Sequence, residues 1–497
     1  MDSTHFPAVT IVLFLAAAAL VPVTVKKTAY SVKKIILPVY IAALIMSGVT
    51  LADVQRNGGF TYDFGSWAQG LGIQFTADAF SALMAVMIIL ISFLVLIYSF
   101  RDIEHEIDPG ERAGYYTLML LVVFAMLGIT YTNDLFNLYV FMEILSIASC
   151  GIISVKRKRE NYLAAFRYLM LNTIGSLSVL MGIALLYMVT GYLNMTEVYL
   201  RIAEVWRTYP RNILIASGFI VTGLAIKAAL FPLHIWLPDA HSSAPTPSSA
   251  LLSGLVVKVY VFCAAKLLFK VIGRTIVISL GIPTFIMYFA ALSMVMGSLF
   301  AIGQRDIKRI LAYSSVAQIG YVFLGIGLAT YQGMAASMFH IISHALMKTA
   351  LFLSAGAVIY SKRIRNVSDF NGIGYRMPVT MTVFAVAALG MVGIPGVNGF
   401  MSKIYLALAV LNAGRPVYLL VILASSFLNA IYYLPILIAA FLKEQPGRKN
   451  VMEMDALPAS MLVPMVLTAF ACVVFGFYPL LLMDIIDRAV PTFFLFK

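Results

Sequence analysis

The stretch LAIKAALFPLHIWLPDAHSSAP, from Leu224 to Pro245, begins as an apolar helix and then interrupts itself. Lys227 places an ammonium group among aliphatic side chains, and three prolines and two histidines follow it within the stretch. Pro232 removes a backbone hydrogen-bond donor and clashes with the preceding helical turn. Non-helical backbone survives at membrane depth only where protein or trapped water satisfies its polar groups. If this stretch lies in a membrane, it therefore predicts a hydrated break in a helix, beside a buried charge.

The rest of the chain is apolar enough to require a membrane. Of its 497 residues, 61% are hydrophobic and 11% are charged, whereas soluble domains are about 45–50% apolar and about 25% charged. About fourteen segments reach the roughly 20 apolar residues that a helix needs to cross the hydrocarbon layer. Closed β-barrels use short alternating strands, which these long apolar runs do not fit. We therefore expect one all-α, polytopic membrane domain over residues 1–497. The predicted spans are 8–25, 32–52, 79–100, 113–131, 134–154, 161–188, 213–240, 245–271, 283–303, 309–329, 334–360, 378–410, 416–442 and 458–485.

The net charge of +13 follows the pattern of a membrane protein. Alternate loops carry most of the basic residues, and such loops face the cytoplasm. We therefore expect a multi-pass protein of the cell (cytoplasmic) membrane, with both termini on the outer side and the lipid bilayer, not nucleic acid, around it. The N-terminal stretch lacks the basic start of a signal peptide, which predicts a retained first span. The basic loop residues are Lys26, Lys27, Lys33, Lys34, Arg101, Arg112, Lys156, Arg157, Lys158, Arg159, Arg305, Lys308, Arg309, Lys362, Arg363, Arg365, Arg376, Lys443, Arg448 and Lys449.

Five charged residues lie well inside the predicted spans: Glu143, Lys227, Lys258, Lys348 and Lys403. A charge at the bilayer centre costs at least about 2.5–3.5 kcal/mol on insertion scales. Ion pairs that hold helices together are the structural explanation, but the single acid in this set cannot neutralise four ammonium groups. A lysine without a counter-ion in a low-dielectric site releases its proton more readily than one in water. The set therefore predicts a proton relay.

Histidines extend the predicted relay. His340, His344 and Lys348 stand at i, i+4 and i+8 of one predicted helix and therefore share a face. We expect His344 to be a relay residue, with His340 and the two histidines around the break, His234 and His241, as secondary candidates. A zinc site would need a third ligand near the HxxxH pair, or the HExxH form of metalloproteases, and neither is present locally. The three cysteines lie far apart in apolar runs, so we expect no metal centre, disulfide framework or cofactor.

A second break is predicted at GIPGVNGFMSK, residues 393–403, where Pro395 and Gly396 interrupt a span and Lys403 follows. Each break falls in the fourth span of a five-span block, and a block of odd length reverses the direction of the next one. This predicts two inverted repeats, 113–271 over spans four to eight and 283–442 over spans nine to thirteen. The broken helices are then spans seven and twelve, and paired broken helices of this kind mark the transport site. The alternative is that the prolines only kink helices for packing.

Five motifs resemble the antiporter-like subunits shared by Mrp sodium/proton antiporters, respiratory complex I, and membrane-bound hydrogenase and sulfur-reducing complexes. They are NDLFNLYVFMEI around Glu143, AIKAALFPLHIWLPDAHSSAPTPSSALLSGLVVKVY across Lys227 and Lys258, RILAYSSVAQIGY at 309–321, HIISHALMKTALFL at 340–353, and GIPGVNGFMSK. The resemblance implies fourteen helices with two inverted five-helix repeats and a coupled Glu143–Lys227 pair. It also implies a hydrated line that continues through Lys258, His344, Lys348 and Lys403. Because only a short segment follows the last predicted span, the chain is most similar to the D-type Mrp subunit or its hydrogenase equivalent.

The sequence thus predicts a proton-translocating, antiporter-like subunit of a hetero-oligomeric membrane complex, with no redox chemistry in this chain itself. It leaves open which complex hosts the chain, whether sodium moves with protons, the direction of transport, and whether a redox enzyme is attached. The alternative is a stand-alone secondary transporter of a small solute, whose broken helices would bind that solute. A third hypothesis is a passive scaffold of a larger complex.

Overall fold

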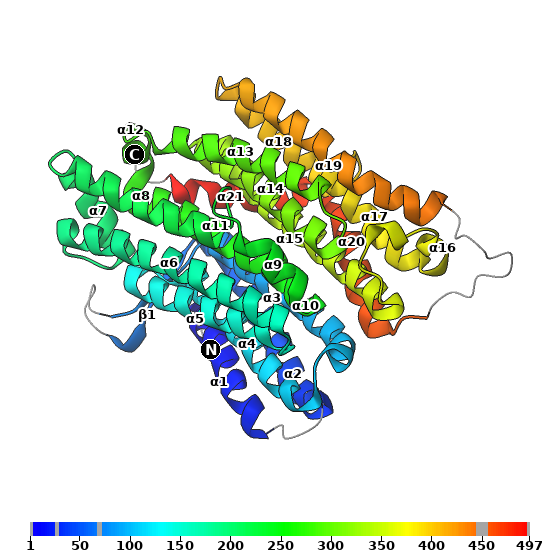
Figure 1. The fold of residues 1–497 in the computed structure, drawn as a ribbon. Helices are drawn as coiled ribbons and strands as arrows, with labels where there is room; N and C mark the ends of the chain where they lie inside the picture. Colours follow the sequence, from blue (N-terminus) through cyan, green and yellow to red (C-terminus); the bar gives the residue numbers. More distant parts are fainter. Residues whose placement is uncertain (1–2, 25–28, 67–71, 444–455, 495–497) are drawn as a thin grey trace.

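The computed structural model of the chain describes residues 3–24, 29–66, 72–443 and 456–494. Lys26, Lys27, Arg448 and Lys449, which the sequence assigns to basic loops, lie outside these ranges. The helices run in slanting, roughly parallel rows, with α1 at one edge of the bundle and α18 and α19 at the opposite edge (Figure 1). A small antiparallel pair of strands, β1 (Phe60–Asp63) and β2 (Gln74–Ala77), precedes α3.

The helices have the following bounds. They are α1 (Phe6–Thr24), α2 (Ala29–Asn57), α3 (Ala79–Glu106), α4 (Arg112–Tyr131), α5 (Leu135–Ser154), α6 (Arg159–Thr190), α7 (Met195–Val205), α8 (Pro210–Lys227), α9 (Trp236–Ser243), α10 (Thr246–Leu251), α11 (Val257–Lys266), α12 (Arg274–Ser279), α13 (Ile282–Ile302), α14 (Ile307–Gly327), α15 (Tyr331–Lys362), α16 (Ile373–Arg376), α17 (Pro378–Val392), α18 (Asn398–Asn412), α19 (Val417–Leu442), α20 (Ala459–Phe477) and α21 (Leu480–Ala489). Two π-helical turns, η4 (Leu252–Val256) and η5 (Leu267–Gly273), flank α11, and short 3-10 turns cover Ser3–His5, Phe64–Ser66, Pro109–Glu111, Val367–Asp369 and Val490–Phe493.

Within the described ranges, 11 helices are long and apolar enough to cross a membrane. The other three predicted spans are each formed by two or more shorter helical segments instead of one long helix. Segment 213–240 forms α8 and α9 with a gap between them, and segment 378–410 forms α17 and α18 in the same way. Segment 245–271 is a run of α10, η4, α11 and part of η5. The all-α membrane fold and both interrupted helices are therefore confirmed.

The chain satisfies the carbonyl groups that the first break leaves free. Helix α8 ends at Lys227, and Ala229 then takes a positive φ of 56°, which turns the backbone out of the helical path. The last four carbonyls of a helix have no partner within it. The indole Nε1 of Trp236, at the start of α9, donates to the carbonyl oxygen of Ile226 over 2.8 Å. The break is thus a built feature and not a frayed helix end.

The second break is built from glycine and from a buried cation. Gly393 has a φ of 94° and Gly396 a φ of 93°, a conformation that side chains disfavour. The carbonyl oxygens of Met391 and Val392, at the end of α17, accept hydrogen bonds from Lys403 over 2.8 and 3.0 Å. Both breaks therefore have a lysine in contact with, or at, the interrupted helix end.

The structure moves two predicted boundaries. The last predicted span, 458–485, ends at Phe477, and α21 follows as a separate helix in contact with α3 and α15. Pro479 starts this new helix because its ring cannot continue the preceding one. At the other boundary, α3 runs to Glu106 instead of ending near residue 100, so that Asp102 lies inside a helix.

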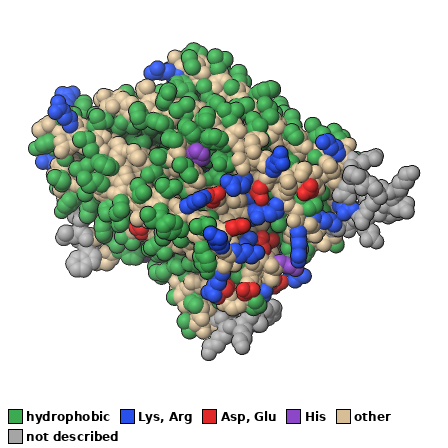
Figure 2. Space-filling model, in the orientation of Figure 1, with side chains coloured by type: hydrophobic (Ala, Val, Ile, Leu, Met, Phe, Trp, Pro, Cys, Tyr) green, Lys and Arg blue, Asp and Glu red, His purple; other side chains and the backbone are tan. Residues whose placement is uncertain are grey.

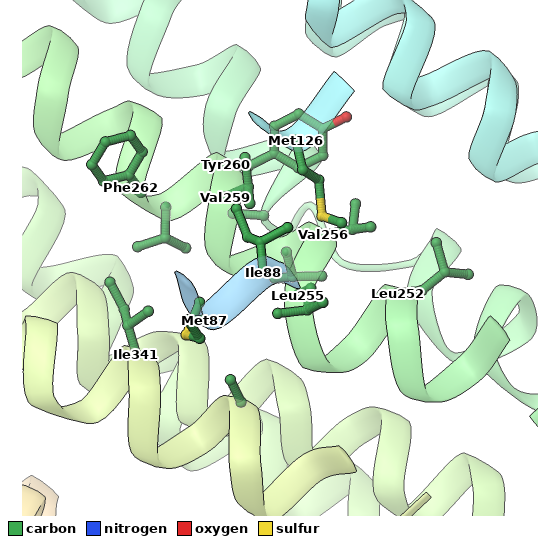
Figure 3. Close-up of a cluster of buried hydrophobic side chains, with 14 of the residues drawn as sticks. Met87, Ile88, Met126, Leu252, Leu255, Val256, Val259, Tyr260, Phe262 and Ile341 are labelled. Carbon is green, nitrogen blue, oxygen red and sulfur yellow. The ribbon is translucent and has the colours of Figure 1, made fainter. Parts of the chain in front are cut away.

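Helix α15 forms the centre of the molecule. All its residues from Gly333 to Val358 are buried, and it contacts α3, α10, α14, α17, α18 and α20. A group of apolar side chains joins α3, α4 and α11 to α15, among them Ile88, Met126, Tyr260 and Ile341 (Figure 3). Because α15 contacts helices from both halves of the chain, it is placed to carry a path from one half to the other.

The outer helices expose large apolar side chains, as expected of surfaces that face lipid. Phe166 on α6, Phe285 on α13 and Phe427 on α19 are all exposed. Charged side chains gather toward one part of the face drawn in Figure 2, and apolar side chains cover most of the rest. Ion pairs join segments that are distant in the sequence: Lys156 with Glu106, Arg309 with Asp239, and Arg365 with Asp306. We call this region, which carries 156–159, 305–309 and 362–365, the basic end.

Candidate functional site

Lys227 is fully buried at the last residue of α8 and is held by neutral groups. Its Nζ donates to Ser146 Oγ over 2.7 Å and lies 5.1 Å from the centre of the Tyr260 ring. The Tyr260 hydroxyl is 3.4 Å from the same serine oxygen. A hydroxyl and an aromatic face therefore stabilise the ammonium group. Both are neutral, so they bind it less strongly than a carboxylate would.

Close packing of two helices fixes the end of α8. A Cβ on Gly223 would lie 2.4 Å from the carbonyl oxygen of Gly175 on α6, so glycine at both positions lets the helices touch. A Cβ on Gly175 would also lie 3.3 Å from Cγ of Lys227. The side chain of Lys227 is thus confined by α6 on one side while it reaches α5 on the other.

Glu143 lies on α5, one turn before Ser146, and is half-buried. Within the described residues, no ion pair joins it to Lys227, and its Oε1 is buried without a hydrogen-bond partner. The charges of the two groups still act on each other. The coupling of Glu143 and Lys227 stays a prediction, and the structure adds that Ser146 stands as the direct partner of the lysine.

Lys258 is fully buried on α11 and bonds to a carbonyl of the π-helical turn that precedes this helix. Its Nζ donates to the backbone oxygen of Ser253, five residues earlier, inside η4. Such single π-helical turns inside helices are frequent at functional sites. The Ser253 hydroxyl lies 2.8 Å from the hydroxyl of Ser315 on α14, which links the two halves of the chain by a polar contact.

Lys348 is the buried charge of the central helix α15. Its Nζ donates to the carbonyl oxygen of Leu311 over 2.7 Å and to the hydroxyl of Ser314. Ser314 is in turn 2.9 Å from the hydroxyl of Tyr433 on α19. As with Lys227 and Lys258, the described partners of this lysine are neutral oxygen atoms.

Two histidines lie between these lysines. His344 on α15 and His241 on α9 are fully buried, and no ring nitrogen of either has a hydrogen-bond partner within the described residues. The charges of both Lys258 and Lys348 act on each of the two rings. Buried polar groups are normally hydrogen-bonded, and unpaired ones need an explanation. A role in accepting and passing protons supplies one.

His340 continues the series on α15. Its Nδ1 lies 2.9 Å from Ser402 Oγ, and its ring stacks on those of Tyr321, at 5.5 Å, and His344, at 5.8 Å. Ser402 is the neighbour of Lys403 in α18, so this histidine connects α15 to the second break. Its predicted place on one face with His344 is therefore matched by the packing.

Lys403 lies on α18, just after the second break. Besides the two carbonyl oxygens of α17, its Nζ donates to Ser426 Oγ over 3.0 Å and lies 5.0 Å from the centre of the Tyr321 ring. Tyr321 also lies 3.3 Å from Ser426 through its hydroxyl. Lys403 thus has the same kinds of partner as Lys227, a serine hydroxyl and a tyrosine ring that themselves meet.

One secondary candidate lies apart from the lysines. His234 packs among the rings of Phe231, Phe300 and Tyr313, with centroid distances of 5.4, 5.7 and 6.0 Å. It shares the first break with Pro232 but turns toward α13 and α14. Pro232, Pro395 and Gly396 themselves lie in the two interruptions, as their sequence positions predicted.

Two buried charges, Asp102 and Lys308, and the partly exposed Glu106 escaped the sequence prediction. Asp102 and Glu106 were assigned to a loop, and Lys308 to the basic residues of the next loops. In the structure Asp102 and Lys308 are buried within α3 and α14. Glu143 is therefore not the single acid inside a span. The signal in the sequence was the apolar spacing Ile103–Ile107, which continues the helix past residue 100.

The opposite end carries an ion pair and a cavity. Lys270 pairs with Asp78, the N-cap of α3, and Lys266 donates to the carbonyl oxygens of Thr130 and Thr132. Asp78, Lys266 and Lys270 line a cavity of about 480 Å³. Burial raises the pKa of Asp78, but the charge and hydrogen bond of Lys270 outweigh it and hold that pKa below its ordinary value. In the described part of the chain, no group of three or more His, Cys, Asp or Glu residues is placed to hold a metal ion.

Comparisons with known proteins match most of the chain. A family model described as "NADH:quinone oxidoreductase/Mrp antiporter, TM" matches residues 132–429, and one described as "NADH-Ubiquinone oxidoreductase (complex I), chain 5 N-terminus" matches residues 68–111. NADH-quinone oxidoreductase subunit N of Desulforudis audaxviator (strain MP104C) is 35% identical, with 98% of this chain and 99% of the relative covered. The D-type subunit of a Na(+)/H(+) antiporter of Alkalihalophilus pseudofirmus is 30% identical, with 90% and 89% covered. A chain of the membrane-bound sulfane sulfur reductase, an archaeal respiratory membrane complex, matches with a TM-score of 0.90 at 29% identity, covering 98% of this chain and 97% of that one.

Proposed function

The chain belongs to the NADH:quinone oxidoreductase/Mrp antiporter transmembrane family, and from this premise we propose that it moves protons through a buried relay of lysines and histidines. It does so as an antiporter-like subunit of a multisubunit membrane complex. The observation that carries the proposal is the set of four enclosed lysines whose described hydrogen-bond partners are hydroxyl and carbonyl oxygens. An ammonium group without a bonded carboxylate can give up its proton and regain it.

The order of the proposed relay follows the contacts. Lys227 and Glu143 begin it, and the Ser146–Tyr260 pair leads from Lys227 to the helix that carries Lys258. Lys258, His344 and Lys348 form the centre. His340 and Ser402 then lead to Lys403. His241 adjoins the centre of the line, and His234 is left out because its ring packs among aromatic side chains on α13 and α14.

Two inverted repeats, 113–271 and 283–442, are part of the proposal. Isolated β-bridges support them: Asp134 pairs with Asn194 and Asp306 pairs with Asn366. In each bridge an N-cap aspartate of a spanning helix, α5 or α14, meets the asparagine N-cap of a later helix. The two bridges have the same spacing along the chain, 134 to 194 and 306 to 366. Matching partners around Lys227 and Lys403 add to this support.

The host is a hetero-oligomeric membrane complex of the cytoplasmic membrane, in which other membrane subunits contact this chain. Protons are the proposed cargo. Because the Alkalihalophilus relative is named as a subunit of a Na(+)/H(+) antiporter, Na+ is the candidate for the ion exchanged against them. The relatives named as respiratory or quinone-reducing place redox chemistry in their complexes, and we assign none to this chain. The basic end faces the cytoplasm under the positive-inside rule, which puts both termini on the outer side.

The relay is tested by removing its central charges. Lys258→Ala and Lys348→Ala should each lower ion translocation by sealed vesicles about tenfold or more, as expected when a positioned proton-transfer group is lost. The control is Lys158→Ala, which removes an exposed lysine at the basic end and should leave the rate unchanged. Rates are normalised to the amount of assembled complex. Wild-type rates in both buried-lysine variants would contradict the relay and favour the scaffold hypothesis.

The stand-alone transporter hypothesis makes a different prediction. A chain that moves an organic solute alone should retain that activity after purification away from every other subunit. The relay proposal expects the chain to copurify with other membrane proteins. Mass spectrometry of the purified complex therefore separates the two, and it also identifies the host.

A further inference from the structure

A cluster of buried charges that the proposed relay does not use lies at the basic end. Asp102 and Glu106 are one helical turn apart on α3, and Lys308 is in the first turn of α14. The side chain of Glu106 is 18% exposed, whereas Asp102 is 1% and Lys308 is 2% exposed. The cluster therefore leads from a carboxylate that touches solvent to groups that are enclosed.

The two carboxylates of this cluster have unequal partners. Glu106 pairs with Lys156 and accepts a hydrogen bond from the Thr246 hydroxyl over 3.3 Å. Within the described residues Asp102 makes no ion pair, and its Oδ2 has no hydrogen-bond partner. A charge enclosed without a bonded partner is costly, and in membrane proteins such groups mark ion pathways. The charged and titratable groups that interact electrostatically with Asp102 are Glu106, Lys156, Lys308, Tyr98, Tyr115 and Tyr116.

Hydrogen bonds lead from the cluster toward the relay. Lys308 donates to the carbonyl oxygen of Ala244 over 2.9 Å and to Ser249 Oγ over 3.4 Å. The Ser249 hydroxyl donates to the carbonyl oxygen of His241 over 2.7 Å. The charges of Lys308, Lys258 and Lys348 all act on His241, whose ring nitrogens have no partner in the described part of the chain. The backbone of His241 is therefore joined to the cluster by hydrogen bonds, and its ring lies within the electrostatic influence of the two central lysines.

We propose that protons enter the relay from the basic end through Glu106, Asp102 and Lys308, and pass to Lys258 and Lys348 through His241. A proton from water binds the Glu106 carboxylate and passes to the Asp102 carboxylate. It then moves through the amine of Lys308 to one ring nitrogen of His241. The other ring nitrogen releases a proton to the amine of Lys348 or Lys258, so each proton taken up is matched by one delivered. This inference rests on the proposed function, because an entrance needs a relay behind it.

The main test compares two acids of the same helix. Asp102→Asn removes the enclosed carboxyl group with little change in shape, and it should lower translocation by sealed vesicles about tenfold or more. Glu104→Gln is the matched control, because Glu104 pairs with Arg101 on the surface and should be dispensable. Asp102→Glu, which keeps a carboxyl group, should retain more activity than Asp102→Asn. Equal rates in Asp102→Asn and Glu104→Gln would overturn the entrance.

A parallel measurement separates this entrance from the relay itself. If Lys348→Ala stops translocation and Asp102→Asn does not, the entrance is wrong and the relay stands. If Lys348→Ala translocates ions at the wild-type rate, the proposed relay is wrong. A slow Asp102→Asn variant would then indicate a structural role of Asp102. If Asp102→Asn lowers assembly, Asp102→Glu at normal assembly decides: wild-type-like translocation supports the entrance, and a rate as low as that of Asp102→Asn refutes it.

Labelling provides a readout that is independent of transport. Glu106→Cys, made in a chain whose three native cysteines are replaced, should react with a membrane-impermeant maleimide added at the basic end. The same reagent added at the opposite side should not react. A carbodiimide that couples to protonated buried carboxyl groups should modify Asp102 but not Glu104, as read by mass spectrometry. Labelling of Glu106→Cys from the opposite side, or no modification of Asp102, would contradict the proposal.

Discussion

At the scale of single residues, the proposed relay depends on cations that lack bonded carboxylates. Lys227 and Lys403 each contact a serine hydroxyl and a tyrosine ring. Lys258 bonds to a carbonyl oxygen of the preceding turn, and Lys348 bonds to a carbonyl oxygen on α14. Such partners satisfy the ammonium protons at the geometry of hydrogen bonds. Because they carry no full negative charge, they leave the lysines free to change protonation state. The ion pairs that do form, such as Lys270 with Asp78, lie at the ends of the bundle.

The Asp78–Lys270 pair gives a prediction about pH. The folded-state pKa of Asp78 lies below its ordinary value of about 3.9. Its ion pair therefore contributes stability above that ordinary value, and the contribution disappears as the pH falls through the folded-state pKa. Asp78→Asn should lower the thermal stability of the purified complex at neutral pH, and the difference from wild type should shrink on acidification.

Asp78→Ala supplies the comparison for that measurement. Asn still accepts from the backbone N–H groups of Phe80 and Ser81, whereas alanine also removes this N-cap, at a cost of about 1 kcal/mol. The alanine variant should therefore be less stable than the asparagine variant at every pH. A stability loss in Asp78→Asn that is the same at neutral and acidic pH would contradict the ion-pair explanation.

The residues that the sequence predicted are those whose type clashes with their surroundings. A lysine in the middle of an apolar run is conspicuous, so all four relay lysines could be named in advance. Asp102 and Lys308 sit near predicted span ends, where charges are ordinary, and only the tertiary packing of α3 and of α14 shows that they are enclosed. Hydroxyl partners such as Ser146 could not be predicted, because serine is common in these helices and its partner depends on tertiary contacts.

At the scale of elements, the interrupted helices depend on close backbone contact as much as on proline. A Cβ on Gly399 of α18 would lie 1.9 Å from the carbonyl oxygen of Gly390 on α17. Only glycine lets the two halves of this broken helix approach so closely, and the approach brings Lys403 to the carbonyl groups of α17. The sequence predicted both breaks from Pro and Gly, but it merged α21 with α20 because apolar residues continue across Pro479.

Gly399→Ala should therefore separate α17 from α18. Forcing a methyl group into packed backbone typically costs about 1–3 kcal/mol, and here it also moves Lys403 away from its acceptors. We expect less assembled complex, a lower melting temperature and little translocation. Gly218→Ala on α8 is the control, because a Cβ there meets no atom within 4 Å. Normal assembly and translocation in Gly399→Ala would show that the break tolerates a wider gap.

At the scale of the whole molecule, one enclosed helix contacts both of the proposed repeats. Helix α15 carries His340, His344 and Lys348 along its axis, and it contacts α10 of the first block and α17 and α18 of the second. The all-α class and the approximate spans follow from hydropathy alone. The position of α15 at the centre does not, because a fully buried helix and a lipid-facing helix are both apolar. Its histidines and lysine were the only sequence signs of an interior place.

Substitutions of Lys403, at the far end of the proposed relay, can separate a structural role of this residue from a role in proton transfer. Its ammonium group satisfies the free carbonyl oxygens of Met391 and Val392, so Lys403→Ala should weaken the second break and stop translocation together. Arginine keeps a positive charge and several N–H donors, but it does not release a proton in proteins. Lys403→Arg should therefore preserve assembly and thermal stability while lowering translocation about tenfold or more, as for loss of a positioned proton-transfer group. Lys443→Arg, at an exposed position after α19, should change neither. If Lys403→Arg moves ions at the wild-type rate in sealed vesicles, protons do not pass through this side chain, and its role is to hold the broken helix together.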